Sequence, residues 1–562
     1  MLSDSIDVTV NNIEYKPTIT RTANRIVIQN PISSIDIGEE YSLYAVALNE
    51  ITTEKKTPYE YADDNIVSFE SEDSSICSIK NGVLKGVSEG STNIIAKDAT
   101  GTVTTTMPIN VVQYNEYVPT NAEIYNVTLP CQTTNGVLHV DNTNSEETTK
   151  AIQDLIKYCT DNNKRKIIFP KGKYLISPEF DSIFIPSNLI IDFSKSDINI
   201  QESSKTTTTG YNMLFFRGTK YSKIINANIY GERFTMTSKS GVESCQSIAF
   251  GDDCYKSGIE NCIVSQSPGF NIGVAKGLTR YTICPLLLKN IESGNINDDG
   301  TNSNEMLDYC FRSIDYINIS TLGDSFGFGN MQGYGGYLYL SARIYDIYFY
   351  DKNKTFISSI KDCIQYFKYN KPTNSKYAKI VFYQTTMPTK CDPDYSAVSM
   401  LYSNDCPNKV FIRNCILEDS YSTAIQPNSG DNWIIENNIF RRNGYRDPAS
   451  HIDWEDGGNN MHGHICRNNT FENGGAVTFV GGSCLVFHNN ILKYSPLKQG
   501  AEVQNSRMWL NQFIGLKSTA NIQTKTDMVF SQNYFIDGAT YTLSPTANIN
   551  FKIHNFKNVQ CV

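Results

Sequence analysis

A short motif, in which one or two asparagines stand between apolar residues, recurs in the second half of this 562-residue chain and constrains its fold most strongly. Clear copies are centred on Asn414, Asn437, Asn468 and Asn489, at successive intervals of 23, 31 and 21 residues. A repeat of roughly 20–30 residues with equivalent corner positions is typical of stacked β-coils. Asparagine suits such corners because it tolerates left-handed backbone and its amide can hydrogen-bond along the stack. The sequence therefore predicts an all-β chain built around a parallel β-helix.

One segment departs from the β pattern. Residues 145–162 begin with acidic residues and place apolar residues at the 3.6-residue period of a helix. The stretch KRKIIFPKGKYLIS follows at 164–177, and further asparagine motifs are centred on Asn261, Asn290 and Asn533. Together these features resemble the pectate-lyase-like β-helix family. The resemblance implies a right-handed parallel β-helix with an N-terminal capping helix, which an open solenoid end needs to cover its core and strand edges.

A separate β unit is predicted before the β-helix. Within residues 20–113, alternating strands are divided by Asn81-Gly82 and Glu89-Gly90 turns, which suits a small β-sandwich. The unit resembles the bacterial Ig-like module of group 2, which implies a spacer or an adhesion unit. Residues 1–19 form an N-terminal segment and residues 114–135 a linker in this scheme.

The asparagine repeat is interrupted by a tyrosine-rich segment at residues 323–398. Its period-two pattern predicts an inserted β-sandwich lobe, similar to insertions in phage tail spike proteins. The β-helix would then comprise residues 136–322 and 399–562. The lobe is either decoration or a carbohydrate-binding element whose tyrosine rings stack on sugars.

Aligning successive coils by their asparagine corners predicts a polar ledge on the outside of the β-helix. Ile425, Ile452 and Val477 point inward in this register, so their neighbours point out. Gln426 and Asn428 on one coil would therefore lie beside Asp453 and Glu455 on the next.

The carboxyl groups of this ledge are the predicted catalytic groups. We expect Asp453 and Glu455 to act as general acid and general base, with Asp456 at the strand end raising the pKa of the acid. Ideal strand geometry separates the pair by roughly 6–9 Å, which fits an inverting hydrolase. Two other interpretations compete with catalysis: the carboxyl groups could bind calcium, or they could form a plain solvated surface. Calcium is the one cofactor that the sequence suggests.

The long loops of the same coil add candidate binding residues. Gln426 and Asn428 would lie under the polymer, and three arginines would hold an anionic group on it: Arg441, Arg442 and Arg446. His451 and His464 flank the carboxylates and are the reserve acid or base.

Composition excludes several function classes. With 49 Lys and Arg against 58 Asp and Glu, the net charge of −9 disfavours nucleic-acid binding. No apolar run is long enough to cross a bilayer, and the N-terminus lacks the pattern of a signal peptide. The 15 cysteines include no CxxC pair, which favours free thiols in a reducing cytosol over disulfides or a metal site.

The motif IDWEDG at 452–457, followed by RNNTF, also resembles the β-helix proteins of phage tails, over about residues 136–562. This resemblance implies a virion tail spike or appendage, assembled in the host cytoplasm, which binds and depolymerises a host glycan such as capsule or teichoic acid. Its partners would be other tail proteins and two further copies in a homotrimer. A non-enzymatic receptor-binding protein or adhesin is the alternative. A secreted polysaccharide lyase is a third, which the missing export signal disfavours.

Overall fold

The computed structural model describes most of the chain. The described residues are 22–49, 60–61, 67–113, 115–128, 132–133, 136–137, 144–201, 209–236, 242–251, 253–275, 281–304, 310–329, 344–364, 368–383, 397–404, 406–445, 449–455, 461–500, 503, 506–522, 528–543 and 551–554. Among them, no helix is both long enough and apolar enough to span a membrane.

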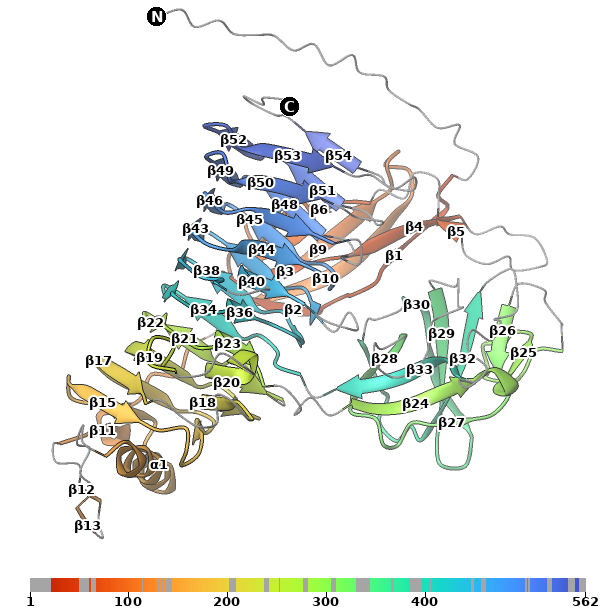
Figure 1. The fold of residues 1–562 in the computed structure, drawn as a ribbon. Helices are drawn as coiled ribbons and strands as arrows, with labels where there is room; N and C mark the ends of the chain where they lie inside the picture. Colours follow the sequence, from red (N-terminus) through yellow and green to blue (C-terminus); the bar gives the residue numbers. More distant parts are fainter. Residues whose placement is uncertain are drawn as a thin grey trace, which may run out of the picture.

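The core of the molecule is a right-handed parallel β-helix, as predicted (Figure 1). Each full coil contributes two strands to a sheet of 20 strands and one strand to a sheet of ten. One coil consists of β38 (Ile434–Glu436), β39 (Ile439–Arg441) and β40 (Ser450–Trp454), and the next of β42 (Ile465–Arg467), β43 (Thr470–Glu472) and β44 (Ala476–Phe479). The remaining strands of the ten-stranded sheet are β16 (Ile183–Phe184), β18 (Tyr211–Arg217), β20 (Cys245–Gly251), β23 (Phe270–Val274), β36 (Thr423–Gln426), β47 (Leu497–Gln499), β50 (Thr519–Ile522) and β53 (Thr540–Leu543).

The asparagine motif divides two tasks between its two residues. The first residue takes the left-handed corner, with φ of 57° at Asn437, 55° at Asn468 and 54° at Asn489. The second residue is buried and joins a continuous ladder of amides: Asn438, Asn469, Asn490, Asn511 and Asn533. In each step the side-chain Nδ2 donates to the Oδ1 of the next asparagine, at 3.0–3.1 Å. Corner geometry and ladder together fix the coil period.

The N-terminal end of the β-helix is capped as predicted. Helix α1 (Ser145–Asp161) is capped by Asn144, whose side chain accepts from the Glu147 backbone N–H at 3.1 Å. Its apolar stripe, including Ile152 and Leu155, is buried in the β-helix core. The first strand, β11 (Ile124–Asn126), pairs with β14 (Lys166–Ile168), so the β-helix begins inside the predicted linker 114–135 and not at residue 136.

The inserted unit is larger than the predicted 323–398. It comprises a sheet with β24 (Tyr281–Leu287), β33 (Ala397–Asn404), β28 (Ser325–Gly329) and β31 (Lys368–Asn370), and a second with β25 (Ile291–Ser293), β26 (Cys310–Ser313), β27 (Ile317–Asn318), β32 (Tyr377–Tyr383), β29 (Ile344–Tyr350) and β30 (Phe356–Ile364). The β-helix strands on either side pair directly, as Ile259 with Ile412 shows. The motif at Asn290 therefore lies in the insert, in the turn before β25, and is not a coil corner.

The N-terminal unit lies against the β-helix. Its main strands are β2 (Ser34–Asp36), β10 (Thr104–Val112), β9 (Gly90–Lys97) and β6 (Ser68–Ser71) in one sheet and β3 (Glu40–Ser42), β8 (Val83–Gly86) and β7 (Cys77–Lys80) in another. Figure 1 shows it alongside the later coils. The buried Arg507 guanidinium donates to Ser42 Oγ at 2.6 Å, and Arg467 forms an ion pair with Glu40. The unit is thus fixed to the solenoid and is not a free-standing spacer.

Candidate functional site

The predicted ledge forms on the outer face of the ten-stranded sheet. Ile425 pairs with Ile452, and Ile452 with Val477, and all three side chains lie in the core. The residue that follows each inward residue points outward, and the same holds for β47. These outward residues form one row across four coils, which we call the ledge row: Gln426, Asp453, Thr478 and Lys498. Strand alternation therefore brings together, as predicted, residues that are far apart in the chain.

Two carboxyl groups of the ledge lie close enough together for Glu455 to alter the protonation of Asp453. Asp453 is 1% exposed, whereas Glu455, two residues further on, is exposed. Burial, and then the charge and the hydrogen bond of Glu455, raise the pKa of Asp453 to about 7. Gln426 Nε2 donates to Glu455 Oε2 at 3.2 Å. The pair thus holds a proton near neutral pH, as two close carboxyl groups do.

The predicted spacing of the two carboxyl groups stays a prediction. Strand alternation puts both side chains on one face of the sheet, where burial and the charge of Glu455 raise the pKa of Asp453. The roughly 6–9 Å expected from ideal strand geometry fits an inverting hydrolase.

Some buried polar atoms of the ledge have no hydrogen-bond partner. Within the part of the chain that the structure describes, these are Gln426 Oε1, Asn428 Oδ1 and Asp453 Oδ1. Such atoms also occur elsewhere, for example Gln29 Oε1 and Ser265 Oγ, so the feature is not confined to the ledge.

Lys498 is a ledge residue that the sequence analysis missed. It is exposed and lies two coils from Asp453 in the ledge row, and its positive charge lowers the pKa of that carboxyl. Extending the corner alignment by one coil, from Val477 to Leu497, would have found it, because Leu497 takes the inward position.

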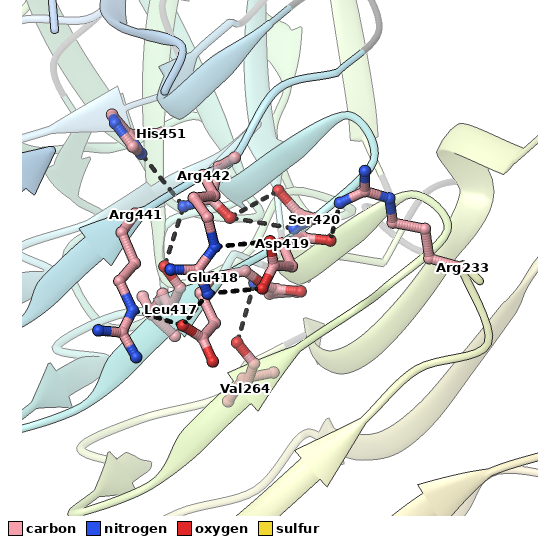
Figure 2. Close-up of polar contacts among 11 residues, drawn as sticks. Arg233, Val264, Leu417, Glu418, Asp419, Ser420, Arg441, Arg442 and His451 are labelled. Carbon is pink, nitrogen blue, oxygen red and sulfur yellow. Dashed lines mark hydrogen bonds and ion pairs between the residues drawn. The ribbon is translucent and has the colours of Figure 1, made fainter. Parts of the chain in front are cut away.

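The predicted anion-binding arginines are engaged elsewhere. Figure 2 shows Arg441 and Arg442 against Glu418 and Asp419 of the preceding coil. Arg442 Nη2 lies 2.7 Å from Glu418 Oε2 and 2.8 Å from Asp419 Oδ2. The carboxylates neutralise both guanidinium groups, so this prediction is wrong for Arg441 and Arg442. Arg446, and with it Asp456, lies outside the described residues.

The two candidate histidines belong to the core. His451 packs against both Phe440 and Phe471, with ring nitrogens 3.1 Å from Asn443 Nδ2 and from Ser495 Oγ. Burial lowers its pKa to about 3. His464 accepts from Trp454 Nε1 at 3.1 Å and contacts the Gly430 carbonyl oxygen at 2.8 Å, and burial lowers its pKa to about 4. Neither ring is exposed, so neither is a reserve acid or base.

No arrangement for a metal ion is found where the structure describes the chain: nowhere there do three His, Cys, Asp or Glu side chains gather closely enough. Because Asp456 is outside those residues, the calcium alternative stays a prediction.

Comparison with known proteins gives structural similarity alone. No family model and no curated protein sequence matches the chain. Among solved structures, it is similar to the A-module of the Azotobacter vinelandii mannuronan C-5 epimerase, with 9% identity over 73% of this chain and 93% of that one and a TM-score of 0.31. The tailspike protein of Pseudomonas phage LKA1 aligns at 9% identity over 94% and 65% of the chains, with a TM-score of 0.27. An exopolygalacturonase from Thermotoga maritima aligns at 10% identity over 72% and 71%, with a TM-score of 0.25. Superpositions this loose indicate nothing about activity.

Proposed function

We propose that this protein binds a carbohydrate polymer along the ledge row and depolymerises it. The observation that carries the proposal is that Asp453, buried beside the exposed Glu455, has a pKa raised to about 7 and so holds a proton near neutral pH. Acid–base catalysis of glycosidic bond cleavage needs such a group. The exposed carboxyl group of Glu455 supplies an acceptor for sugar hydroxyls.

Glu455 is the member of the pair that a ligand can reach, because it is exposed while Asp453 is buried. In this proposal the shared proton passes from Asp453 to Glu455 and from there to the oxygen of the leaving sugar as the glycosidic bond breaks. A water molecule from solvent adds its oxygen to the anomeric carbon and returns one proton to the carboxyl pair. Gln426 orients the Glu455 carboxylate through its amide hydrogen bond. Asp453 then acts through Glu455, as a proton source and positioning residue.

A binding-only receptor or adhesin is the second candidate, and one observation favours it. Asp453 is buried, so Glu455 is the one carboxyl of the pair that faces a ligand, whereas a hydrolase places two carboxyl groups against the substrate and its water. In that case the ledge would recognise sugar hydroxyls without cleaving the polymer.

The biological setting follows the sequence resemblance to phage tail proteins. We propose a virion tail spike or appendage whose substrate is a bacterial surface polymer, such as capsule or teichoic acid, and whose assembled form is a homotrimer.

The test incubates the full chain and two variants, Glu455→Gln and Asp453→Asn, with a panel of purified capsules, teichoic acids and lipopolysaccharides. Release of reducing ends reports hydrolysis, and absorbance of unsaturated uronates reports a lyase. We expect each variant to lose about 10²–10⁴-fold in turnover while polymer binding survives. Glu472→Gln, a carboxylate of β43 on the other sheet, is the matched control. Binding by the parent without any cleavage would select the binding-only function.

A further inference from the structure

A second group of side chains lies at the opposite end of the ledge strands. It consists of Arg233, Phe234, Tyr421 and Tyr445, which we call the aromatic platform. The Arg233 guanidinium carbon lies 3.6 Å from the ring centroid of Tyr445, 4.8 Å from that of Phe234 and 5.9 Å from that of Tyr421. Phe234 is 66% exposed and Tyr445 55%. Large aromatic rings this exposed and this close together are typical of binding surfaces.

The platform is held in place by the coil corners. The Tyr445 backbone N–H donates to the Tyr421 carbonyl oxygen at 2.9 Å, which sets the two tyrosines on successive coils. The Arg233 Nη1 donates to the Asp419 carbonyl oxygen at 2.6 Å (Figure 2). The two tyrosine backbones and the guanidinium are therefore held in place before any ligand arrives, which lowers the entropic cost of binding.

The charge of Arg233 differs from that of its neighbours. Arg441 and Arg442 face Glu418 and the Asp419 carboxylate, whereas Arg233 contacts the Asp419 backbone carbonyl. Among the described residues Arg233 forms no ion pair within 4.0 Å, so its positive charge is not cancelled by a carboxylate. A guanidinium stacked on aromatic rings keeps edge N–H groups that match carboxylate or phosphate.

The platform and the ledge share two coils. Tyr421 precedes β36, which ends at Gln426, and Tyr445 precedes β40, which carries Asp453. Gln426 is five residues after Tyr421, which in an extended strand is a distance of at most roughly 17 Å. One polymer that lies along these strands can therefore contact both the platform and the ledge row. We infer that the aromatic platform is a saccharide subsite that binds an anionic sugar unit, with its ring face on the aromatic side chains and its carboxylate or phosphate on Arg233. This inference rests on the proposed function, since it places the same polymer on both surfaces.

The test measures binding of three defined probes by calorimetry: tetragalacturonate, a glycerol-phosphate oligomer and neutral maltotetraose. We expect the parent to bind at least one anionic probe more tightly than maltotetraose, with affinity that falls as salt rises. Arg233→Ala and Tyr445→Ala should each weaken that binding about tenfold. Tyr117→Ala removes an equally exposed tyrosine outside the platform and should change nothing.

Three results would overturn the inference: no binding of either anionic probe, equal binding of maltotetraose, or parent-like affinity in both platform variants. Tyr445→Phe, which keeps the ring, should bind as the parent does, and its failure would also count against stacking. Cleavage by Glu455→Gln at the parent rate, together with weakened binding by the platform variants, would refute the catalytic role of the ledge and leave the platform standing.

Discussion

The amide ladder and the ledge row are both lines of polar side chains that run along the same solenoid. They differ in how many of their buried polar atoms have hydrogen-bond partners. In the ladder, Asn469 accepts from Asn438 and donates to Asn490 and to the Ile435 carbonyl oxygen. In the ledge, the buried Oε1 of Gln426 and Oδ1 of Asp453 have no partner among the described residues.

The difference separates structural polar residues from functional ones. A buried amide with all its partners adds rigidity and specifies the coil register. A buried acceptor without a partner costs stability and persists where another requirement outweighs that cost. The ladder amides are therefore structural, whereas the ledge is the candidate site because Asp453 and Glu455 lie there together.

The largest effect should come from breaking the ladder. Asn469→Ala leaves the Asn438 and Asn490 side chains and the Ile435 carbonyl oxygen short of partners, and should cost roughly 4–5 kcal/mol. Hydrogen exchange of β38, β42 and β43 amides measures the loss. Gln426→Ala, which removes a ledge amide, should cost less than about 1 kcal/mol, and similar losses in the two variants would contradict the comparison.

The pH dependence of Asp453 should run opposite to that of an ordinary acid. Its pKa of about 7 in the folded protein exceeds the unfolded value of 3.8, so the folded state binds more protons between these values and stability falls as pH rises through them. Asp453→Asn removes the buried charge and should stabilise the protein by roughly 4 kcal/mol at pH 8, with little gain at pH 4. Thermal unfolding across this range is the measurement, with Glu472→Gln as control. A gain independent of pH would show that Asp453 is not a buried, titrating group.

His451 lies on the same strand as Asp453 and should titrate in the opposite sense. Burial lowers its folded pKa to about 3 from 6.5, so the unfolded state takes up the proton first and stability falls as pH drops below about 6.5. His451→Gln should reduce this acid sensitivity by roughly 2 kcal/mol between pH 7 and pH 5. The quantity to compare is how the difference in unfolding free energy between variant and parent changes with pH. The loss of packing is the same at every pH and cancels in this comparison. An unchanged slope would contradict a buried neutral ring.

The smallest effect should come from Lys498. Its charge lowers the pKa of Asp453 across two coils, so Lys498→Met should raise that pKa by a fraction of one unit. Carboxyl carbon NMR during a pH titration detects the change. Lys493→Met, an exposed lysine on β46 (Ile491–Lys493) of the other sheet, should leave the titration of Asp453 where it is.

The sequence by itself determined the coil architecture and the facing of the ledge. The interval between asparagines set the coil length, and the period of two placed Ile425, Ile452 and Val477 inside and Gln426 and Asp453 outside. Both results depend on local geometry, namely left-handed corners and strand alternation, which a short stretch of sequence specifies. The capping helix follows from its periodicity for the same reason.

The tertiary structure alone decided which polar groups are satisfied. Arg442 is neutralised because the preceding coil places Asp419 at the same corner, and His451 turns into the core to meet Asn443 and Ser495. The extent of the insert likewise depends on Ile259 pairing with Ile412 across 152 intervening residues. Such contacts join residues from different coils, and their distances depend on how the coils stack and on the rotamers that packing allows. A local sequence pattern specifies neither the stacking of the coils nor the rotamers. The sequence therefore predicts the position of the ledge but not the hydrogen-bond and ion-pair partners of its residues.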